Sequence, residues 1–503
     1  MDSTSVADRY LAELAVWDPI AAQALGQDPH VLVPDLSPEA FAAKEAIARE
    51  ALTRLSTNDI LGAALEDRLE ADIALSEAGF TTRLLAPLFT PVHLVRRVIA
   101  DLPRDHPARI EDNLAAVPAA LAGYQDTLRA SAARGHIAPR RQALLVARQS
   151  ESWVDFYRDL PGGQAAATAT VEFARFLTNE LAPLAPSEDA VGTDLYTRTA
   201  RAFLGTTIDL ADTYAYGWAE LRRLSAEIAD VAREISPDGV DAAIAELDQS
   251  QGPAVLGWLR DRVAATTDAL DGTHFDIPPA TRNVECHIDA TAGVMYYVPP
   301  DPQLTRPGRV YWTPDSTATW RAVTTLHHES LPGHHLQHAI AMTQPLHPWQ
   351  RALCHVHGYA EGWAHYAEHL ADELGLITGP AERLGLLLGR MWRAARVVID
   401  IGLHVGPAIP AGTGFTEAET WTPAVARQFL VDVARLDPTS ARFEVDRYLG
   451  WPAQALAFTT GARLWHEIRA AYHHTDLKRF HMDALRLGPM GLDPLRAALT
   501  SRS

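Results

Sequence analysis

The stretch His328-Glu329-Ser330-Leu331-Pro332-Gly333-His334-His335 lies where a helix is expected to break. Proline inside a helix removes a backbone hydrogen bond, and glycine permits the turn that follows. On an unbroken helix, residues six positions apart differ by ~240° and ~9 Å of rise, so His328 and His334 would not face the same point. We therefore predict a helix that ends near Pro332 and Gly333. The break turns His334, or alternatively His335, back toward His328.

The same stretch gathers residue types that bind metal ions. Neutral imidazole is the commonest protein ligand for zinc-like ions. A neighbouring carboxylate such as Glu329 is suited to act as a base toward water at such a site. A catalytic zinc site needs three protein ligands, and Glu361 lies 32 residues after Glu329, a suitable spacing for a returning antiparallel helix. Glu361 is the expected third ligand. The alternative is a histidine-rich helix end whose imidazoles bond to carbonyl groups.

Composition excludes several classes of protein. The 503 residues are 47% hydrophobic, enough for a large buried core, and 44 basic against 63 acidic residues give a net charge of −19. That charge disfavours nucleic acids and anionic membranes as partners. The two cysteines, Cys286 and Cys354, provide no disulfide framework. The sequence shows neither a signal peptide nor a run of ~20 apolar residues, so we expect a cytoplasmic protein.

Apolar residues recur at three-four spacing over most of the chain, which indicates helices. Prolines, glycines and short β-prone runs at 294–298 and 309–312 interrupt this pattern, and a long loop is expected at 405–422. We predict a mainly α fold: one domain, 1–503, with an N-terminal helical half (1–271) and a metal-site half (272–503) around a deep central cleft, and a small β element near 290–313. The clearest expected helices of the first half are 38–56, 111–134, 139–159, 164–181, 195–235 and 253–270.

Ten of the 21 histidines lie between residues 327 and 369, far above an even spread. Within this region Glu361, His365 and Glu368 are spaced by four and three, so they share one helical face. For His365 the favoured interpretation is an ordinary helix face rather than a metal ligand. The same holds for His369.

A third group of polar residues lies on an apolar helix. Arg396, Asp400 and His404 are spaced by four, and charged groups in such surroundings must be paired. An internal Arg396–Asp400 salt bridge and a polar strip facing the cleft explain the first two equally well. For His404 we favour a proton donor or a hydrogen-bond donor to the transition state. Tyr448 and Arg447 could stabilise an oxyanion near a metal.

The chain resembles the bacterial domain-of-unknown-function 885 family over nearly its full length. The most specific matching pieces are H-E-x-x-P-G-H-H at 328–335 and E-G-W-A at 361–364. Further matches are Trp17-Asp18-Pro19, residues 34–39, Trp392-Arg393-Ala394-Ala395-Arg396 with Asp400, Gly402 and His404, Arg447-Tyr448 with Trp451-Pro452 and Gln454, Gly461, and residues 476–481. The sequence departs from the family at His365, usually apolar, at Ala453, usually glycine, and at Phe458, usually tyrosine.

This resemblance implies a helical fold similar to that of all-helical zinc peptidases, and a metal-dependent hydrolase. Carried over by position, His328, His334 and Glu361 would hold one zinc ion, with Fe2+ or Mn2+ as alternatives, and Glu329 would be the general base. The expected substrate is a small peptide or amide. The other residues expected at the site are His404 and Tyr448 as catalytic groups, and Tyr297, His335, Arg396, Arg447 and Gln454 as substrate-binding groups.

Two other functions remain open at this point. A set of two histidines and one carboxylate also suits iron(II), so the chain could be a redox enzyme or lyase acting on a small metabolite in specialised biosynthesis. A binding protein that keeps the groove without catalysis is the third possibility.

Overall fold

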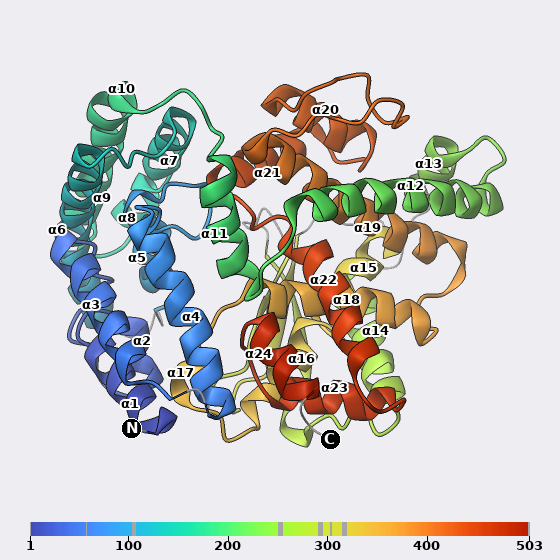
Figure 1. The fold of residues 1–503 in the computed structure, drawn as a ribbon, viewed down its shortest axis with the longest axis horizontal. Helices are drawn as coiled ribbons and strands as arrows, with labels where there is room; N and C mark the ends of the chain where they lie inside the picture. The colour runs from blue at the N-terminus through green and yellow to red at the C-terminus, as the bar shows by residue number, and fades with distance from the viewer. Residues whose placement is uncertain are drawn as a thin grey trace.

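The computed structural model describes residues 2–56, 58–102, 107–249, 255–289, 295–301, 304–313 and 319–500. Over these residues the protein is mainly helical with one small three-stranded sheet, which confirms the predicted fold class (Figure 1). The predicted cleft and the division at 271/272 stay predictions.

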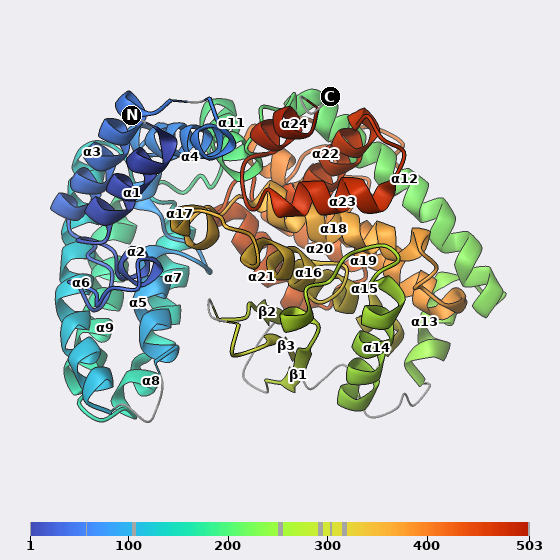
Figure 2. The ribbon, with the colours of Figure 1, turned by 90° about the horizontal axis from the view of Figure 1, so that it is seen from below.

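The first part of the chain forms a layer of helices with an apolar cluster of its own, made of residues between Val33 and Ala182 (Figure 2, left). Helix starts follow the local sequence: Ser37 accepts a hydrogen bond from the Ala40 amide, and Pro38 occupies the first turn. The helices are α1 (Ser3–Leu14), α2 (Pro19–Ala24), α3 (Pro38–Arg54), α4 (Ile60–Glu77), α5 (Pro91–Ala100), α6 (Pro107–Ala133), α7 (Arg140–Ser152), α8 (Val154–Arg158), α9 (Gln164–Phe176) and α10 (Ala182–Leu184).

The helix predicted at 195–235 is two helices, α11 (Gly192–Leu204) and α12 (Leu210–Ile235). Gly205 ends α11 with a φ of +62°, a left-handed conformation that suits glycine. A Cβ there would lie 2.1 Å from the Cα of Gly491, so the close approach also excludes larger residues. Asp209 then caps α12 by accepting a hydrogen bond from the Asp212 amide at 2.9 Å. The helix predicted at 139–159 is likewise divided, between α7 and α8.

The sheet contains β1 (Val284–Ile288), β2 (Tyr296–Val298) and β3 (Gly308–Trp312), in the order β1-β3-β2. β1 runs parallel to β3, and β2 runs antiparallel to it. The β-prone runs predicted at 294–298 and 309–312 contain β2 and β3, with Val294 outside the described residues, whereas β1 was missed. In β1 the apolar residues Val284 and Cys286 alternate with polar neighbours, a pattern typical of a strand with one buried face. Both apolar residues are buried in the structure, so this alternation could have predicted the strand.

The remaining helices enclose the main apolar cluster, which also takes in α1 and α4. α18 (His357–Glu373) and α22 (Ala457–Ala471) lie side by side (Figure 1) and touch at Gly362 and Gly461, where a Cβ on Gly362 would be 2.8 Å from the Gly461 Cα. These helices are α13 (Val240–Gln249), α14 (Val255–Leu270), α15 (Thr319–Glu329), α16 (His334–Met342), α17 (Pro348–Ala352), α18 (His357–Glu373), α19 (Gly379–Val405), α20 (Pro423–Asp432), α21 (Pro438–Gly450), α22 (Ala457–Ala471), α23 (Leu477–Arg486) and α24 (Leu492–Thr500).

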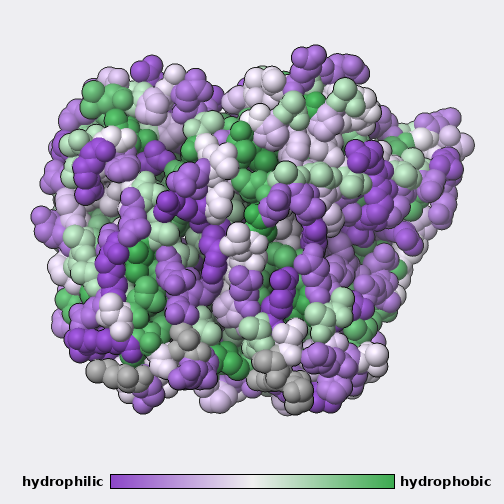
Figure 3. Space-filling model, viewed as in Figure 1, coloured by the Kyte–Doolittle hydropathy of each residue, from purple (hydrophilic) through white to green (hydrophobic). Residues whose placement is uncertain are grey.

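The surface is mixed in character. On the face shown in Figure 3, hydrophilic and hydrophobic side chains are interspersed. Among the helices of the described ranges, none has the length and apolar character needed to cross a membrane.

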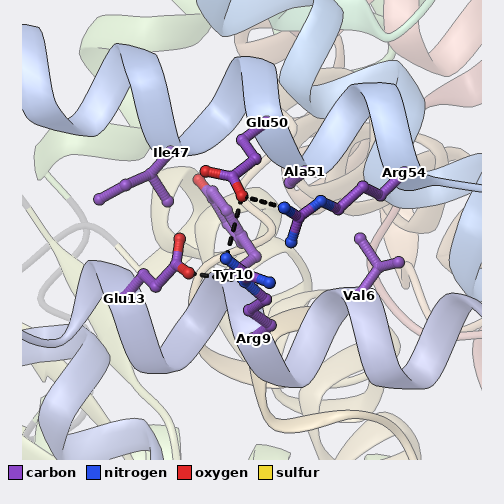
Figure 4. Close-up of a pocket in the computed structure, with 8 residues that line it drawn as sticks. All are labelled: Val6, Arg9, Tyr10, Glu13, Ile47, Glu50, Ala51 and Arg54. Carbon is purple, nitrogen blue, oxygen red and sulfur yellow. Dashed lines mark hydrogen bonds and ion pairs between the residues drawn. The ribbon is translucent and has the colours of Figure 1, made fainter. Parts of the chain in front are cut away.

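A small pocket lies between α1 and α3, far from the histidine-rich region in the sequence (Figure 4). Arg9 pairs there with Glu13 at 2.7 Å and with Glu50 at 2.9 Å, and Arg54 also pairs with Glu50. Arg9, Glu13, Glu50 and Arg54 thus pair with one another across the two helices, although Nη1 of Arg54 has no hydrogen-bond partner among the described residues, and we ascribe the pocket to the packing of α1 against α3.

Candidate metal centre

The helix break lies where the sequence predicts it. α15 ends at Glu329 and α16 begins at His334. A Cβ on Gly333 would lie 1.9 Å from the carbonyl oxygen of His328, so this tight turn requires glycine. Trp363 of α18 holds the turn in place, because its Nε1 donates to the carbonyl oxygens of Pro332 at 3.0 Å and Gly333 at 3.3 Å.

The turn brings His334 back to His328, and α18 adds Glu361. Oε2 of Glu361 lies 3.2 Å from Nε2 of His328 and 3.4 Å from Nε2 of His334. Each of the three residues offers a ligand atom within 4.8 Å of the other two. Two imidazole nitrogens and one carboxylate oxygen are a donor set that suits zinc and leaves room for a further ligand. The three residues therefore fit the ion that the resemblance implies.

The neighbouring His335 has a different place. Its Nε2 donates to the carbonyl oxygen of Thr281 at 2.8 Å, and its Nδ1 accepts from the Tyr297 hydroxyl at 3.0 Å. The His335 side chain is fully buried, and burial lowers its pKa to about 4. Both ring nitrogens are therefore used in structural hydrogen bonds. His334, and not His335, therefore contributes to the cluster. Tyr297 contacts His335 and holds its ring by a hydrogen bond.

Glu368 orients His328. Its Oε1 accepts from Nδ1 of His328 at 2.8 Å and lies 2.9 Å from Nη2 of Arg393, while its Oε2 accepts from Thr324 at 3.0 Å and lies 3.2 Å from Nδ1 of His365. A carboxylate that bonds the far nitrogen of a ligating histidine fixes the tautomer and the ring orientation. Sequence reasoning placed Glu368 on the face of Glu361 but gave it no role, and it gave none to Arg393.

Charge interactions within the cluster shift its pKa values. Burial lowers the pKa of His328, but hydrogen bonds with Glu361 and Glu368 outweigh it and raise the value to about 9. Burial raises the pKa of Glu361, yet His334 and His328 hold it well below its usual range. Glu361 is therefore ionised, the form that binds a cation. Burial is also the main reason why the pKa of Glu329 is raised.

Glu368→Gln is expected to weaken zinc binding by roughly 10- to 100-fold, the usual effect of losing a partner behind a ligand. The amide carries no charge to balance Arg393 and cannot accept hydrogen bonds at both of its ends. Competition with a chromophoric chelator measures the affinity. Glu373→Gln, on the same helix but paired with Arg469 at the surface, is the matched control and should bind zinc like the unaltered protein. Equal affinities in both variants would exclude this role.

A second buried network joins α19, α21 and the segment before α22. Glu444 accepts from Arg447 and, at 2.6 Å, from the Tyr448 hydroxyl, and it pairs with Nη2 of Arg396 at 3.1 Å. Gln454 accepts from Nη1 of Arg447. The hydroxyl proton of Tyr448 is thus committed to Glu444, which argues against the predicted catalytic role of this tyrosine. Arg396 pairs with Glu444 and not with Asp400, so the Arg396–Asp400 salt bridge, one of the two interpretations that the sequence allowed equally, does not form.

His404, the other residue predicted as a catalytic group, is buried. The side chain is 1% exposed, and its Nε2 donates to the carbonyl oxygen of Tyr448 at 2.9 Å. Burial lowers the pKa of His404 to about 4, so the ring is neutral. Its described neighbours include Asp400 at 4.0 Å and the ring of Tyr196. The ring proton is thus donated to a backbone carbonyl, whereas the buried Nδ1 of His404 has no hydrogen-bond partner among the described residues. A role of His404 in the chemistry stays a prediction.

Asp400 should make stability depend on pH. Burial raises its pKa from 3.8 to about 7, against the hydrogen bonds from Tyr196 and the Ala453 amide and the charge of Arg447; neutral His404 lies nearby. The folded protein keeps a proton that the unfolded chain releases, so the contribution of Asp400 to the free energy of unfolding falls as the pH rises from about 4 to about 7.

The variant Asp400→Asn removes this titration. Its stability relative to the unaltered protein is expected to rise by roughly 3–4 kcal/mol across that pH range and then to level off. Denaturant unfolding at several pH values measures the difference. A difference that stays constant with pH would contradict the raised pKa.

Fold and cluster together define a mainly helical protein that brings two histidines and a carboxylate together around one point, with His328 buried and the other two partly exposed. The chain belongs to the family described as bacterial protein of unknown function DUF885, whose sequence profile covers residues 19–499. This confirms the family that the sequence motifs indicated. No curated protein matches the chain.

Solved structures share the fold over nearly the whole chain. One is the crystal structure of "the putative lipoprotein from Colwellia psychrerythraea", with a TM-score of 0.80 and 18% identity, covering 99% of this chain and 98% of that one. Another is "a putative lipoprotein of unknown function from Shewanella oneidensis", with a TM-score of 0.74, 15% identity and 98% of each chain covered. At these identities the likeness shows the fold alone.

Proposed function

We propose that this protein is a metal-dependent hydrolase that cleaves peptide or amide bonds in small substrates. One observation carries the proposal: His328, His334 and Glu361 offer ligand atoms within 4.8 Å of one another, and Glu329 directly follows His328 in the sequence. Three ligands of this kind plus an open position are typical of catalytic zinc sites, whereas structural zinc sites use four protein ligands. A carboxylate that neighbours the ligands but lies outside the set is suited to act as a base, which supports Glu329 in that role.

Glu368 and Arg393 support the ligand His328. Glu368 accepts the Nδ1 proton of His328, which leaves Nε2 facing Glu361. Arg393 balances the charge of Glu368 at 2.9 Å, so that this carboxylate remains an acceptor in buried surroundings.

The reaction needs a base and an electrophile. Bound zinc would polarise the scissile carbonyl and lower the pKa of a water molecule. Glu329 takes the proton from the attacking water and returns it to the leaving nitrogen, the ordinary task of a general acid–base in hydrolysis. A partly desolvated carboxylate with a raised pKa is better matched to holding that proton.

Metal content and turnover test the proposal together. The protein is stripped with a chelator, reloaded with zinc, and assayed on a panel of short peptides and amides by mass spectrometry. We expect one zinc ion per chain, cleavage by the reloaded protein, and no cleavage by the stripped protein. Failure to bind zinc, or cleavage that is indifferent to stripping, would overturn it. Anaerobic loading with iron, followed by oxygen-dependent turnover of a metabolite, would support the redox alternative instead.

A further inference from the structure

Arg396 is a buried arginine with spare hydrogen-bonding capacity. Its side chain lies on α19 and the residue is 5% exposed. The guanidinium carbon lies over two rings, 4.2 Å from the centroid of Trp392 and 4.4 Å from that of Phe458. Nη2 contacts Glu444, but Nε and Nη1 have no hydrogen-bond partner among the described residues. Buried N–H groups without a partner are costly, so a group that bonds to them would be favoured.

The geometry of guanidinium shows what such a group would be. Nη2 carries two hydrogens, one beside the Nε hydrogen and one beside an Nη1 hydrogen, so the group has two edges with two donors each. Because Glu444 touches Nη2 alone, one complete edge is free. A two-donor edge of this kind matches the two oxygens of a carboxylate.

Arg447 is the other arginine that was expected to bind substrate, and it has no such capacity. Its Nε and Nη2 donate to Glu444 at 3.2 and 2.8 Å, and its Nη1 donates to Gln454. The same contacts occupy the carbonyl oxygen of Gln454. Two guanidinium groups, those of Arg396 and Arg447, therefore share the single carboxylate of Glu444. A further anion at Arg396 would balance the local charge.

Phe458 connects this arginine to the candidate metal centre. The rings of Phe458 and His328 are stacked, with centroids 6.0 Å apart and planes inclined by 15°. The 6.0 Å from His328 to Phe458 and the 4.4 Å from Phe458 to Arg396 together put the guanidinium within about 10 Å of the His328 ring. An extended peptide advances ~3.3–3.6 Å per residue, so about three residues cover that distance.

We infer that Arg396 binds the free C-terminal carboxylate of a peptide substrate, at most about three residues beyond the bond that is cleaved. This inference rests on the proposed hydrolase function and gives it a substrate class: peptides with a free C-terminus, from which short C-terminal pieces are released. A peptide whose C-terminus is an amide has no anion for the free edge of Arg396.

The test compares matched peptides that end in a free acid or in a C-terminal amide, assayed on the zinc-loaded protein. Charge-assisted hydrogen bonds of this strength correspond to a preference of roughly 10- to 100-fold for the acid in kcat/KM. Arg396→Gln should abolish the preference, so that the variant cleaves the acid peptide and the amide peptide with equal kcat/KM. Arg396→Lys keeps the charge without the two-donor edge and should recover only part of the preference.

Arg390→Gln is the matched control, because Arg390 is a largely buried arginine on the same helix that pairs with Glu220 and also has an unpartnered Nε. This variant should keep the full preference for the acid. Calorimetry with a dipeptide acid and its amide, on zinc-loaded protein, provides a readout that needs no turnover: the acid should bind more tightly, and Arg396→Gln should remove the difference.

The outcomes separate this inference from the proposed function. Equal cleavage and equal binding of acid and amide by the unaltered protein would overturn the role of Arg396 and leave the hydrolase standing. Release of long C-terminal fragments alone would do the same. Absence of zinc binding together with absence of cleavage of either peptide would overturn the hydrolase itself.

Discussion

Glu329→Gln is expected to lower kcat by roughly 100- to 10,000-fold while zinc content and stability stay close to those of the unaltered protein. That range is the usual contribution of a positioned general base. The amide has the shape of the carboxylate but cannot take a proton from water at neutral pH. Glu329 lies outside the three-ligand cluster, so its replacement removes no metal ligand. Steady-state turnover and elemental analysis of the same preparation measure both quantities.

Glu361→Gln is the informative contrast to this variant. It makes the same chemical change in a carboxylate of the ligand cluster, so it should lose zinc and activity together. If Glu329→Gln retained the full rate, Glu329 would not be the base. If it lost zinc as Glu361→Gln does, it would have to be counted among the ligands.

His334→Ala and His335→Ala should differ sharply although the residues are adjacent. His334 is part of the cluster, and loss of a ligand is expected to weaken zinc binding by more than the roughly 10- to 100-fold that an outer partner contributes. His335→Ala removes a buried ring that bonds Thr281 and Tyr297. It should keep zinc but lower the free energy of unfolding by roughly 2–5 kcal/mol.

Zinc titration and denaturant unfolding of both variants test this pair. Normal zinc affinity in His334→Ala would remove His334 from the ligand set. Loss of zinc in His335→Ala, in protein that remains folded, would show that the turn can present either ring.

The sequence predicted the helix break because its cause is local. Proline and glycine in succession end a helix regardless of what packs around them. The break in the helix predicted at 195–235 has a glycine signal as well, at Gly205, but isolated glycines also occur inside helices. What makes Gly205 decisive is its contact with Gly491, and a contact between residues so distant in the chain cannot be read from periodicity.

The candidate site shows the same limit. His328, His334 and Glu361 could be grouped from motif and spacing, since a turn and a returning helix suffice. The true partners of Arg396 and Asp400 are Glu444 and Tyr196, which come from other helices. Helical spacing suggested an Arg396–Asp400 pair on one face, but packing against those helices offered each side chain a different partner. The orienting role of Glu368 likewise emerges only when α15 lies against α18.

The contact between Gly362 and Gly461 restricts how the centre can change shape. The backbones of the two glycines are in direct contact there, and neither residue has a side chain. A change of side-chain size at this contact therefore cannot be used to shift α18 along α22. Glu361 immediately precedes one glycine, and Phe458 lies three residues before the other. The Glu361 carboxylate and the Phe458 ring, which stacks on His328, consequently keep a fixed separation. Engineering the site to accept bulkier molecules would therefore require a substitution of Phe458 itself, not a change in the spacing of the two helices.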